Sequence, residues 1–193
     1  MESSVAESAS AAEAPKSRYA MGSMANLARS LVAILAMMAL LFFMVPRSNT
    51  VSGPPVDIHG EAVQVAQRTG WPIVEAVGLP PTWKATSARY VRSTSELMTW
   101  HAGYQTPGGE YVAIEQTMNP TAKWVGAQTS RAVPSGTLEA AGKTWTRYIR
   151  PGKLQNSLLY KPTGTNELTW LVTGTASFEE MALFTGYLQP VKP

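Results

Sequence analysis

The side chains that could do acid–base chemistry are few, and their spacing along the chain does not suggest a site. There are two histidines, His59 and His101, and Asp57 is the single aspartate. Neither histidine has a metal-binding partner four residues further on, so there is no H-E-x-x-H helix. The simplest interpretation of Asp57 and His59 is a helix cap followed by a surface residue. His101 follows Trp100 in a segment typical of a strand.

The common nucleotide and nucleophile motifs are also missing. Gly142-Lys143-Thr144 resembles the end of a phosphate-binding loop, but that motif needs a glycine at position 137, which is a threonine. The residues that follow are typical of a strand, whereas the motif requires a helix N-terminus. There is no G-x-S-x-G nucleophile elbow, and the absence of cysteine excludes a thiolate metal site, a cysteine nucleophile and a lipidated cysteine. We therefore expect no catalytic, cofactor-binding or metal-ligating residue, no cofactor, and a protein that is not an enzyme.

The aromatic residues allow a second kind of site. Six tryptophans are spread over the chain after residue 70, several of them beside Thr and Tyr in segments typical of strands. They could line a cleft for a sugar or an apolar ligand, or fill the core between a sheet and its helices. Their even spacing follows the predicted elements, which favours the core. The candidate contacts for a ligand or partner are Trp100, Tyr104, Trp124 and Trp170.

A long apolar segment precedes these residues. From Leu31 to Val45, fifteen residues carry no charged or hydrogen-bonding side chain. Extending the segment back to Leu27 gives nineteen positions, and the one charge, on Arg29, lies near the end, where it can reach the lipid headgroups. A spanning helix needs about 20 mostly apolar residues. The segment 27–45 is therefore predicted to be a transmembrane helix.

The flanks of this segment argue against two alternatives and predict its orientation. A cleaved export signal would end in small residues, but this segment ends in bulky ones followed by Pro46. A soluble core helix would show a polar face, which is absent. Lys16, Arg18 and Arg29 precede most of the apolar residues, whereas only Arg47 follows closely. By the positive-inside rule, the N-terminus is then cytoplasmic.

These features divide the chain into four parts. Residues 1–26 are small and polar, and they are predicted to form a disordered cytoplasmic tail. The transmembrane helix over 27–45 is followed by a linker rich in Pro, Ser and Gly at 46–56. Residues 57–193 are predicted to form one extracytoplasmic domain, so the protein is expected in the cell membrane as a single-pass protein.

Within the domain, the hydrophobic pattern changes from a helical to a strand period near residue 80. A first helix is predicted between a cap at Asp57 and a stop at Gly70, with Ile58, Ala62 and Val65 on its apolar face. Strands are predicted over 82–91, 97–106, 111–118, 137–150 with a turn at 141–143, 156–162 and 167–176.

Two further helices are predicted among and after these strands. Asn119 and Pro120 suit the cap and first position of a short helix over 122–128. Ser177 and Glu180 form a capping box for a last helix over 177–188.

Tight turns imply antiparallel neighbours. The expected fold class is therefore α+β: an antiparallel sheet of about seven strands with helices packed on one face, preceded by one N-terminal transmembrane helix. A closed barrel is the alternative.

Several segments together resemble a known bacterial family. They are LPPTWKATSARY at 79–90, WHAGYQTPGGEYVAIEQ at 100–116, GKTWTRY at 142–148 and TWLVTGTASFEEM at 169–181. The chain resembles the single-span membrane proteins catalogued as domain of unknown function 4245, from the apolar segment to near the C-terminus. The resemblance implies an N-terminal anchor and one exported domain. It brings no assigned activity and no site residues.

Three functions fit the sequence. The favoured one is a membrane-anchored interaction or accessory module of the bacterial cell envelope, with an envelope protein as possible partner. The alternative is a domain that binds an envelope lipid, sugar or peptide in a pocket lined by Trp and Tyr. Less favoured is a hydrolase of envelope material, which would require a cleft where His101 meets a Glu and a Ser or Thr. The net charge of +3 is scattered, so no nucleic-acid partner is expected.

Overall fold

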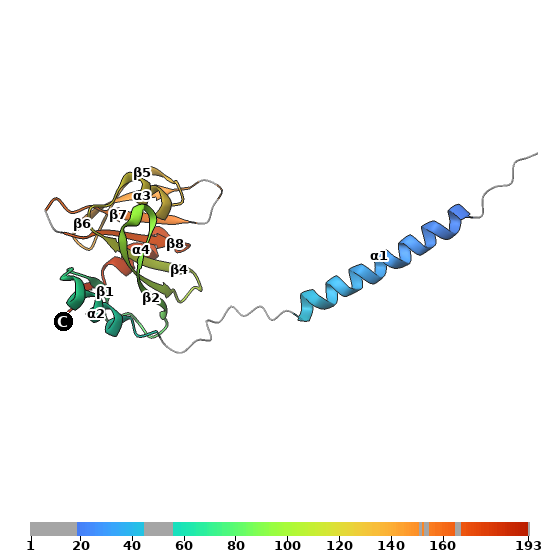
Figure 1. The fold of residues 1–193 in the computed structure, drawn as a ribbon, viewed down its shortest axis with the longest axis horizontal. Coiled ribbons are helices and arrows are strands. Elements are labelled where there is room, and N and C mark those ends of the chain that lie inside the picture. The colour runs from blue at the N-terminus through green and yellow to red at the C-terminus, as the bar shows by residue number, and fades with distance from the viewer. Residues whose placement is uncertain (1–18, 45–55, 151, 153–154, 165–166, 193) are drawn as a thin grey trace, which may run out of the picture. The chain divides into compact units, whose positions relative to one another are not determined.

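The structure is a computed structural model that describes residues 19–44, 56–150, 152, 155–164 and 167–192 (Figure 1). The chain divides into two compact units, with the boundary between Ser48 and Asn49. The first contains one helix and the second contains the folded domain. The predicted linker, apart from Val56, lies outside the described residues. Residues 1–18 of the predicted tail also lie outside them.

The first unit contains α1 (Tyr19–Met44), a helix of 26 residues. Its part from Met24 to Met44 has a mean hydropathy of 2.3. Among the described residues, this is the one helix long and apolar enough to cross a membrane. The helix begins eight residues before the predicted start at Leu27, so the prediction of disorder is wrong for residues 19–26. Once the apolar segment is helical, each added residue gains a hydrogen bond, and these Ala and Met residues are good helix formers.

The domain begins with α2 (Ile58–Thr69), which has the predicted caps. The side chain of Asp57 accepts a hydrogen bond from the Gly60 N–H, and Gly70 closes the helix with a φ of 69°. The three apolar residues predicted to face the core are its buried residues. After it comes β1 (Val74–Ala76), which pairs with β9 (Leu188–Pro190) in a small antiparallel sheet near the C-terminus.

The main sheet has seven antiparallel strands in the order β2-β3-β4-β8-β7-β6-β5. Each half is a meander with short connections, and the central pairing of β4 with β8 joins the halves. Strands β2 and β5 form the two edges, so the sheet is open and the barrel alternative is wrong. The strands are β2 (Lys84–Arg92), β3 (Met98–Gln105), β4 (Tyr111–Thr117), β5 (Val133–Ala140), β6 (Lys143–Ile149), β7 (Asn156–Tyr160) and β8 (Thr169–Gly174), with a 3-10 turn, η1 (Thr94–Glu96), between β2 and β3.

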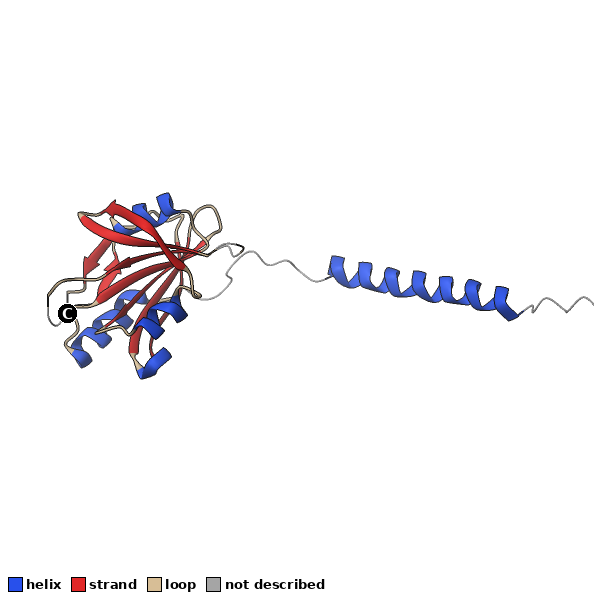
Figure 2. Cartoon of the chain, turned by 90° about the horizontal axis from the view of Figure 1, so that it is seen from above, coloured by secondary structure: helices blue, strands red, loops and turns tan. Residues whose placement is uncertain are grey.

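Helices cover both faces of this sheet, as Figure 2 shows. On the face that we call the α2/α4 face, α2 and α4 (Phe178–Thr185) pack against a core that includes Trp100, Ile114 and Val172. On the opposite face, which we call the α3 face, α3 (Ala122–Gln128) packs Trp124 and Val125 onto Leu159 and Leu171. The α+β class is confirmed, but the prediction that all helices share one face is wrong for α3. Because β4 is central and β5 is an edge, the connection between them must cross a face of the sheet.

Two predicted helix ends also differ from the structure. The short helix α3 is capped by Thr121, whose hydroxyl accepts from the Trp124 N–H at 3.1 Å, rather than by Asn119. Asn119 has a φ of 47° and turns the chain just before the helix. The capping box of Ser177 and Glu180 is confirmed, but α4 ends at Thr185 because the next residues turn back into β9.

The length and polarity of α1 lead to a test of the anchor. Replacing Leu35 and Leu40 by Arg in the full-length chain should remove it from the membrane fraction, because each charge near the bilayer centre costs about 2.5–3.5 kcal/mol on insertion scales. The measurement is alkaline extraction of cell membranes followed by immunoblotting. The matched control replaces the same two leucines by Ala, which should leave the chain in the membrane. Retention of the arginine variant would contradict a spanning helix.

Candidate functional site

The four residues predicted as ligand or partner contacts do not converge. Trp100 and Trp124 are fully buried and Tyr104 is 5% exposed, whereas Trp170 is partly exposed. Trp124 lies on the α3 face, where its indole N–H donates to Ser93 and Thr99, and the other three lie on the α2/α4 face. The interpretation of tryptophans as core residues is confirmed for Trp100 and Trp124, as it is for Trp83 and Trp145.

Of these four residues, Tyr104 lines a groove in the described part of the domain. A groove of about 310 Å³ lies between the start of α2 and strands β2 and β3, with Trp83 and the Leu79-Pro80-Pro81 segment in its wall. The rings of Trp83 and Tyr104 both pack on Phe184, at 5.8 and 5.2 Å between centroids. Burial raises the pKa of Tyr104 to about 12, so its hydroxyl stays protonated.

An ion pair lies at the rim of this groove. Nδ1 of His59 is 2.6 Å from Oε1 of Glu75, whose side chain is 7% exposed. The hydrogen bond to Glu75, and then its negative charge, raise the pKa of His59 above its ordinary value of 6.5. The pair tethers the first turn of α2 to β1.

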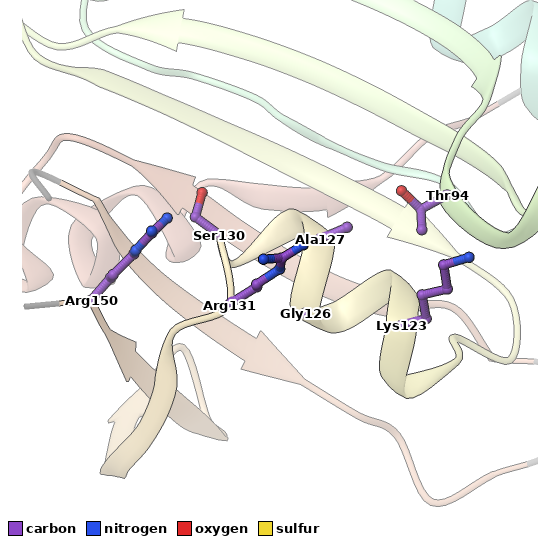
Figure 3. A pocket seen from close by; sticks show the side chains of 7 residues that line it. All are labelled: Thr94, Lys123, Gly126, Ala127, Ser130, Arg131 and Arg150. Atoms are coloured by element: carbon purple, nitrogen blue, oxygen red, sulfur yellow. The ribbon is translucent and has the colours of Figure 1, made fainter.

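A second and larger pocket, of about 530 Å³, lies beside α3 and carries positive charge. Lys123, Arg131 and Arg150 line it together with Thr94 and Ser130, and no carboxylate is among its lining residues (Figure 3). Within the described part of the chain, these three cations take part in no ion pair or hydrogen bond through their side chains. Figure 3 shows Lys123 near Thr94 at one end of the pocket and Arg150 at the other, with Arg131 between them.

The end of α3 positions the middle of this pocket. Ser130 and Arg131 both adopt left-handed backbone conformations, with φ of 54° and 59°. The Arg131 N–H donates to the Gly126 carbonyl at 2.6 Å, which closes the helix. Gln155 accepts from the Ser130 hydroxyl and donates to the Gln128 carbonyl, so it ties this turn to the sheet. These hydrogen bonds therefore hold the turn in place although Ser130 and Arg131 have unfavourable backbone conformations.

The third candidate site is a polar cluster on the α3 face near strand β2. Nδ1 of His101 lies 2.6 Å from Oε1 of Glu115, and both residues are buried, at 3% and 8% exposure. Nε2 of the same ring lies 2.9 Å from the Ser87 hydroxyl and 3.2 Å from the Tyr111 hydroxyl. Burial is the main reason that the pKa of Tyr111 is raised above 10.

Two backbone features assemble this cluster. A β-bulge shifts the register between Ala85 and Ser87, and bulges re-aim the side chains beside them. Gly103 supplies the space: a Cβ there would lie within 3.0 Å of the hydroxyl oxygens of Thr86, Ser87 and Tyr111. Three hydroxyls therefore gather around one point next to the His101 ring. Of these, the Thr86 hydroxyl is buried without a hydrogen-bond partner among the described residues.

Sequence reasoning missed both the cationic pocket and the partners of His101. The pocket draws on α3, the turn after it and the end of β6, which no linear motif connects. The pairing of His101 with Glu115 had a signal, because both lie seven residues from Gly108 at the centre of the predicted hairpin turn. No sequence signal pointed to Ser87 as a partner of His101, because the bulge changes the register of β2. Among the described residues, no group of three or more His, Asp or Glu side chains could hold a metal.

The model of the family described as "Protein of unknown function (DUF4245)" matches residues 20–187, so the chain belongs to that family, as its motifs indicated. No curated protein matches the sequence. Among solved structures, a chain of the Pseudomonas aeruginosa MucA/MucB complex is similar over 62% of this chain and 35% of that one, with 11% identity and a TM-score of 0.39. Similarity at that level identifies neither a shared fold nor a shared function.

The crowded space at Gly103 leads to a stability prediction. Gly103→Ala should destabilise the domain by about 1–3 kcal/mol, because the added methyl group must displace three hydroxyls. The measurement is urea unfolding followed by tryptophan fluorescence, since all six tryptophans follow the anchor. The control is Gly126→Ala, where a Cβ meets open space inside a helix, and which should be neutral or stabilising by up to about 1 kcal/mol. Equal stabilities of the two variants would contradict the packing around Gly103.

The pair of His59 with Glu75 leads to a pH prediction. Because the folded state raises the pKa of His59, protonation contributes stability that is fully present below about pH 6.5 and is lost as pH rises through the folded pKa. The wild-type chain should therefore exceed His59→Gln in melting temperature at pH 6, and the gap should narrow by pH 8. An NMR titration of the His59 ring should give a pKa above 6.5. A gap that widens with pH would contradict the ion pair.

Proposed function

We propose that this DUF4245 member is a membrane-anchored accessory module of the bacterial envelope that docks an acidic segment of a partner protein in the pocket beside α3. The observation that carries the proposal is the set of three cationic side chains without a carboxylate partner among the described residues. Guanidinium groups pair with carboxylates through two parallel hydrogen bonds, which gives both strength and orientation.

The spread of charge in the pocket favours an acidic segment over a single phosphate. Lys123 and Arg150 lie at opposite ends of the pocket, with Arg131 between them (Figure 3). A compact phosphate would be best held by cations that converge on one point, whereas several carboxylates along a peptide match charges in a row. The hydroxyls of Thr94 and Ser130 add neutral hydrogen-bonding groups to the same wall.

Two further parts of the proposal concern location. The apolar helix α1 supports a single-pass anchor. The excess of basic residues before the apolar segment supports a cytoplasmic N-terminus, which leaves the domain on the outer side of the membrane. On that side, the partner is an envelope protein.

The test compares two variants with the same change in charge. Lys123→Glu with Arg131→Glu reverses two charges in the pocket, and Lys161→Glu with Lys192→Glu reverses two exposed charges outside it. Each variant, tagged after Pro193, is cross-linked in intact native cells, and captured proteins are quantified by mass spectrometry. The proposal expects one envelope protein that wild type and the control capture and that the pocket variant captures at least about tenfold less, because reversing two charges replaces attraction by repulsion and tenfold corresponds to only about 1.4 kcal/mol.

A second step separates the pocket from indirect effects. Acidic peptides from the captured protein are titrated against the purified chain, and their affinity should fall as salt rises and fall further in the pocket variant. Equal capture by the pocket variant and the control would overturn the proposal. A captured partner without an acidic segment that binds would do the same.

A further inference from the structure

The cluster around His101 has the connectivity of a nucleophilic site, independently of the pocket beside α3. Ser87, His101 and Glu115 come from three adjacent strands, β2, β3 and β4, and they bond in that order. This is the order in which a serine nucleophile, an imidazole base and an orienting carboxylate act in hydrolases. We propose that Ser87 is the nucleophile of a site that hydrolyses carboxylic esters, with His101 as its base.

The hydrogen bonds determine where the protons lie. An ionised carboxylate only accepts, so the contact with Glu115 favours the tautomer of His101 that has its proton on Nδ1 and a lone pair on Nε2. One lone pair can accept from only one hydroxyl at a time. Ser87 lies closer to Nε2 than Tyr111 does, at 2.9 against 3.2 Å, so the serine proton goes to the ring. The Tyr111 hydroxyl, which also hydrogen-bonds to Ser87, is then a donor beside the serine oxygen.

The surroundings supply donors for the oxygen that becomes charged. The Thr86 hydroxyl is buried without a partner, and it gathers with those of Ser87 and Tyr111 around Gly103. Burial keeps Tyr111 protonated, as its raised pKa indicates. Two neutral hydroxyl donors therefore flank the nucleophile, and donors placed in this way stabilise the oxyanion of an attacked ester.

Access to the site follows from its place at the sheet edge. Ser87 and Tyr111 are partly exposed, whereas His101 and Glu115 are buried beneath them. Strand β2 is an edge strand, and the partly exposed Ser87 side chain is the group of the cluster that an ester would meet first. The charged groups that face the cluster are Glu115 from β4 and the exposed Arg89 from β2, which pairs with His101 in the β2–β3 register.

The reaction balances without a cofactor. Ser87 Oγ attacks the ester carbonyl carbon while its proton moves to Nε2 of His101, and the resulting tetrahedral oxyanion is held by Thr86 and Tyr111. Collapse breaks the bond to the alcohol oxygen, which leaves with the proton from Nε2. Water then attacks the acyl-serine and loses a proton to Nε2. Collapse of this second intermediate breaks the bond between the acyl carbon and Ser87 Oγ, which takes the proton back from Nε2 as the carboxylic acid leaves.

The first test is covalent labelling of the full-length chain in detergent with a fluorophosphonate probe, together with hydrolysis of p-nitrophenyl acetate. Wild type should be labelled with loss of fluoride, the mass should map to Ser87, and Ser87→Ala should lose the label. Ser135→Ala, at an exposed serine on β5, should keep it. Labelling of wild type no greater than that of Ser87→Ala would overturn the proposal.

The second test reads the base directly and needs no substrate. Because the chain has no cysteine, Ser87→Cys and Ser135→Cys each introduce the single thiol. An ordinary thiol, with a pKa near 8.5, is almost entirely protonated at pH 6, whereas an imidazolium partner stabilises the thiolate. Iodoacetamide at pH 6 should therefore alkylate Cys at position 87 at least about tenfold faster than at 135. Adding His101→Gln to Ser87→Cys should remove the difference, with circular dichroism confirming that the variant is folded. Equal alkylation rates at the two positions would overturn the role of His101 as base.

Discussion

The pairing of β4 with β8 is the contact on which the rest of the domain depends. Six residue pairs, from Val112 with Gly174 to Thr117 with Thr169, join two meanders that are otherwise made of local hairpins. Each partner lies more than fifty residues from the other, so this pairing carries the main loop-closure cost of the seven-stranded sheet. Once it forms, β4 is central. The chain must then leave β4, cross the sheet and start again at the far edge with β5.

That crossing creates the candidate binding surface. The connection lays α3 across the sheet, and Trp124 anchors it by filling the space above Leu159 and Leu171. With one side of this seven-residue helix fixed by Trp124 and Val125, the other side and the turn after it are left to display Lys123 and Arg131. The pocket is therefore a by-product of topology that the sequence has lined with positive charge. A long side chain can be exchanged there without disturbing the packing of the sheet.

The α3 face is buried but unusually polar, which separates it from the α2/α4 face. The α2/α4 face has an ordinary core of large apolar side chains. The α3 face instead buries Thr99, His101, Glu115, Ser157 and Thr173. Most of these side chains find partners, such as the hydroxyl pair of Ser157 and Thr173 at 2.8 Å. A His and Glu pair at that depth costs solvation that apolar residues would not cost. Stability alone does not explain such a buried pair, and the proposed role of His101 as a base does explain it.

The sequence predicted the elements and the seven-stranded antiparallel sheet well, but it did not predict which face α3 covers or which residues meet at the candidate sites. The α2 caps, the strand positions, the 122–128 helix and the Ser177 capping box all depend on local chemistry, which a linear pattern contains. The two three-residue strands β1 and β9 were missed because three residues show no period. The sequence also did not predict which face of the sheet α3 covers, because that placement depends on the β4–β8 pairing rather than on the residues of the helix. Likewise, the pairing of His101 with Glu115 was within reach of the predicted hairpin, while Ser87 depends on a bulge.

In the proposed function, a shared membrane lowers the affinity that the pocket beside α3 needs for its partner. In that function the domain and its partner share one membrane, and short tethers raise the effective concentration of two such binding groups to the millimolar range. Three surface cations, each screened by salt, bind an acidic segment only weakly in free solution. For the proposed docking function, a weak and reversible pocket is therefore sufficient.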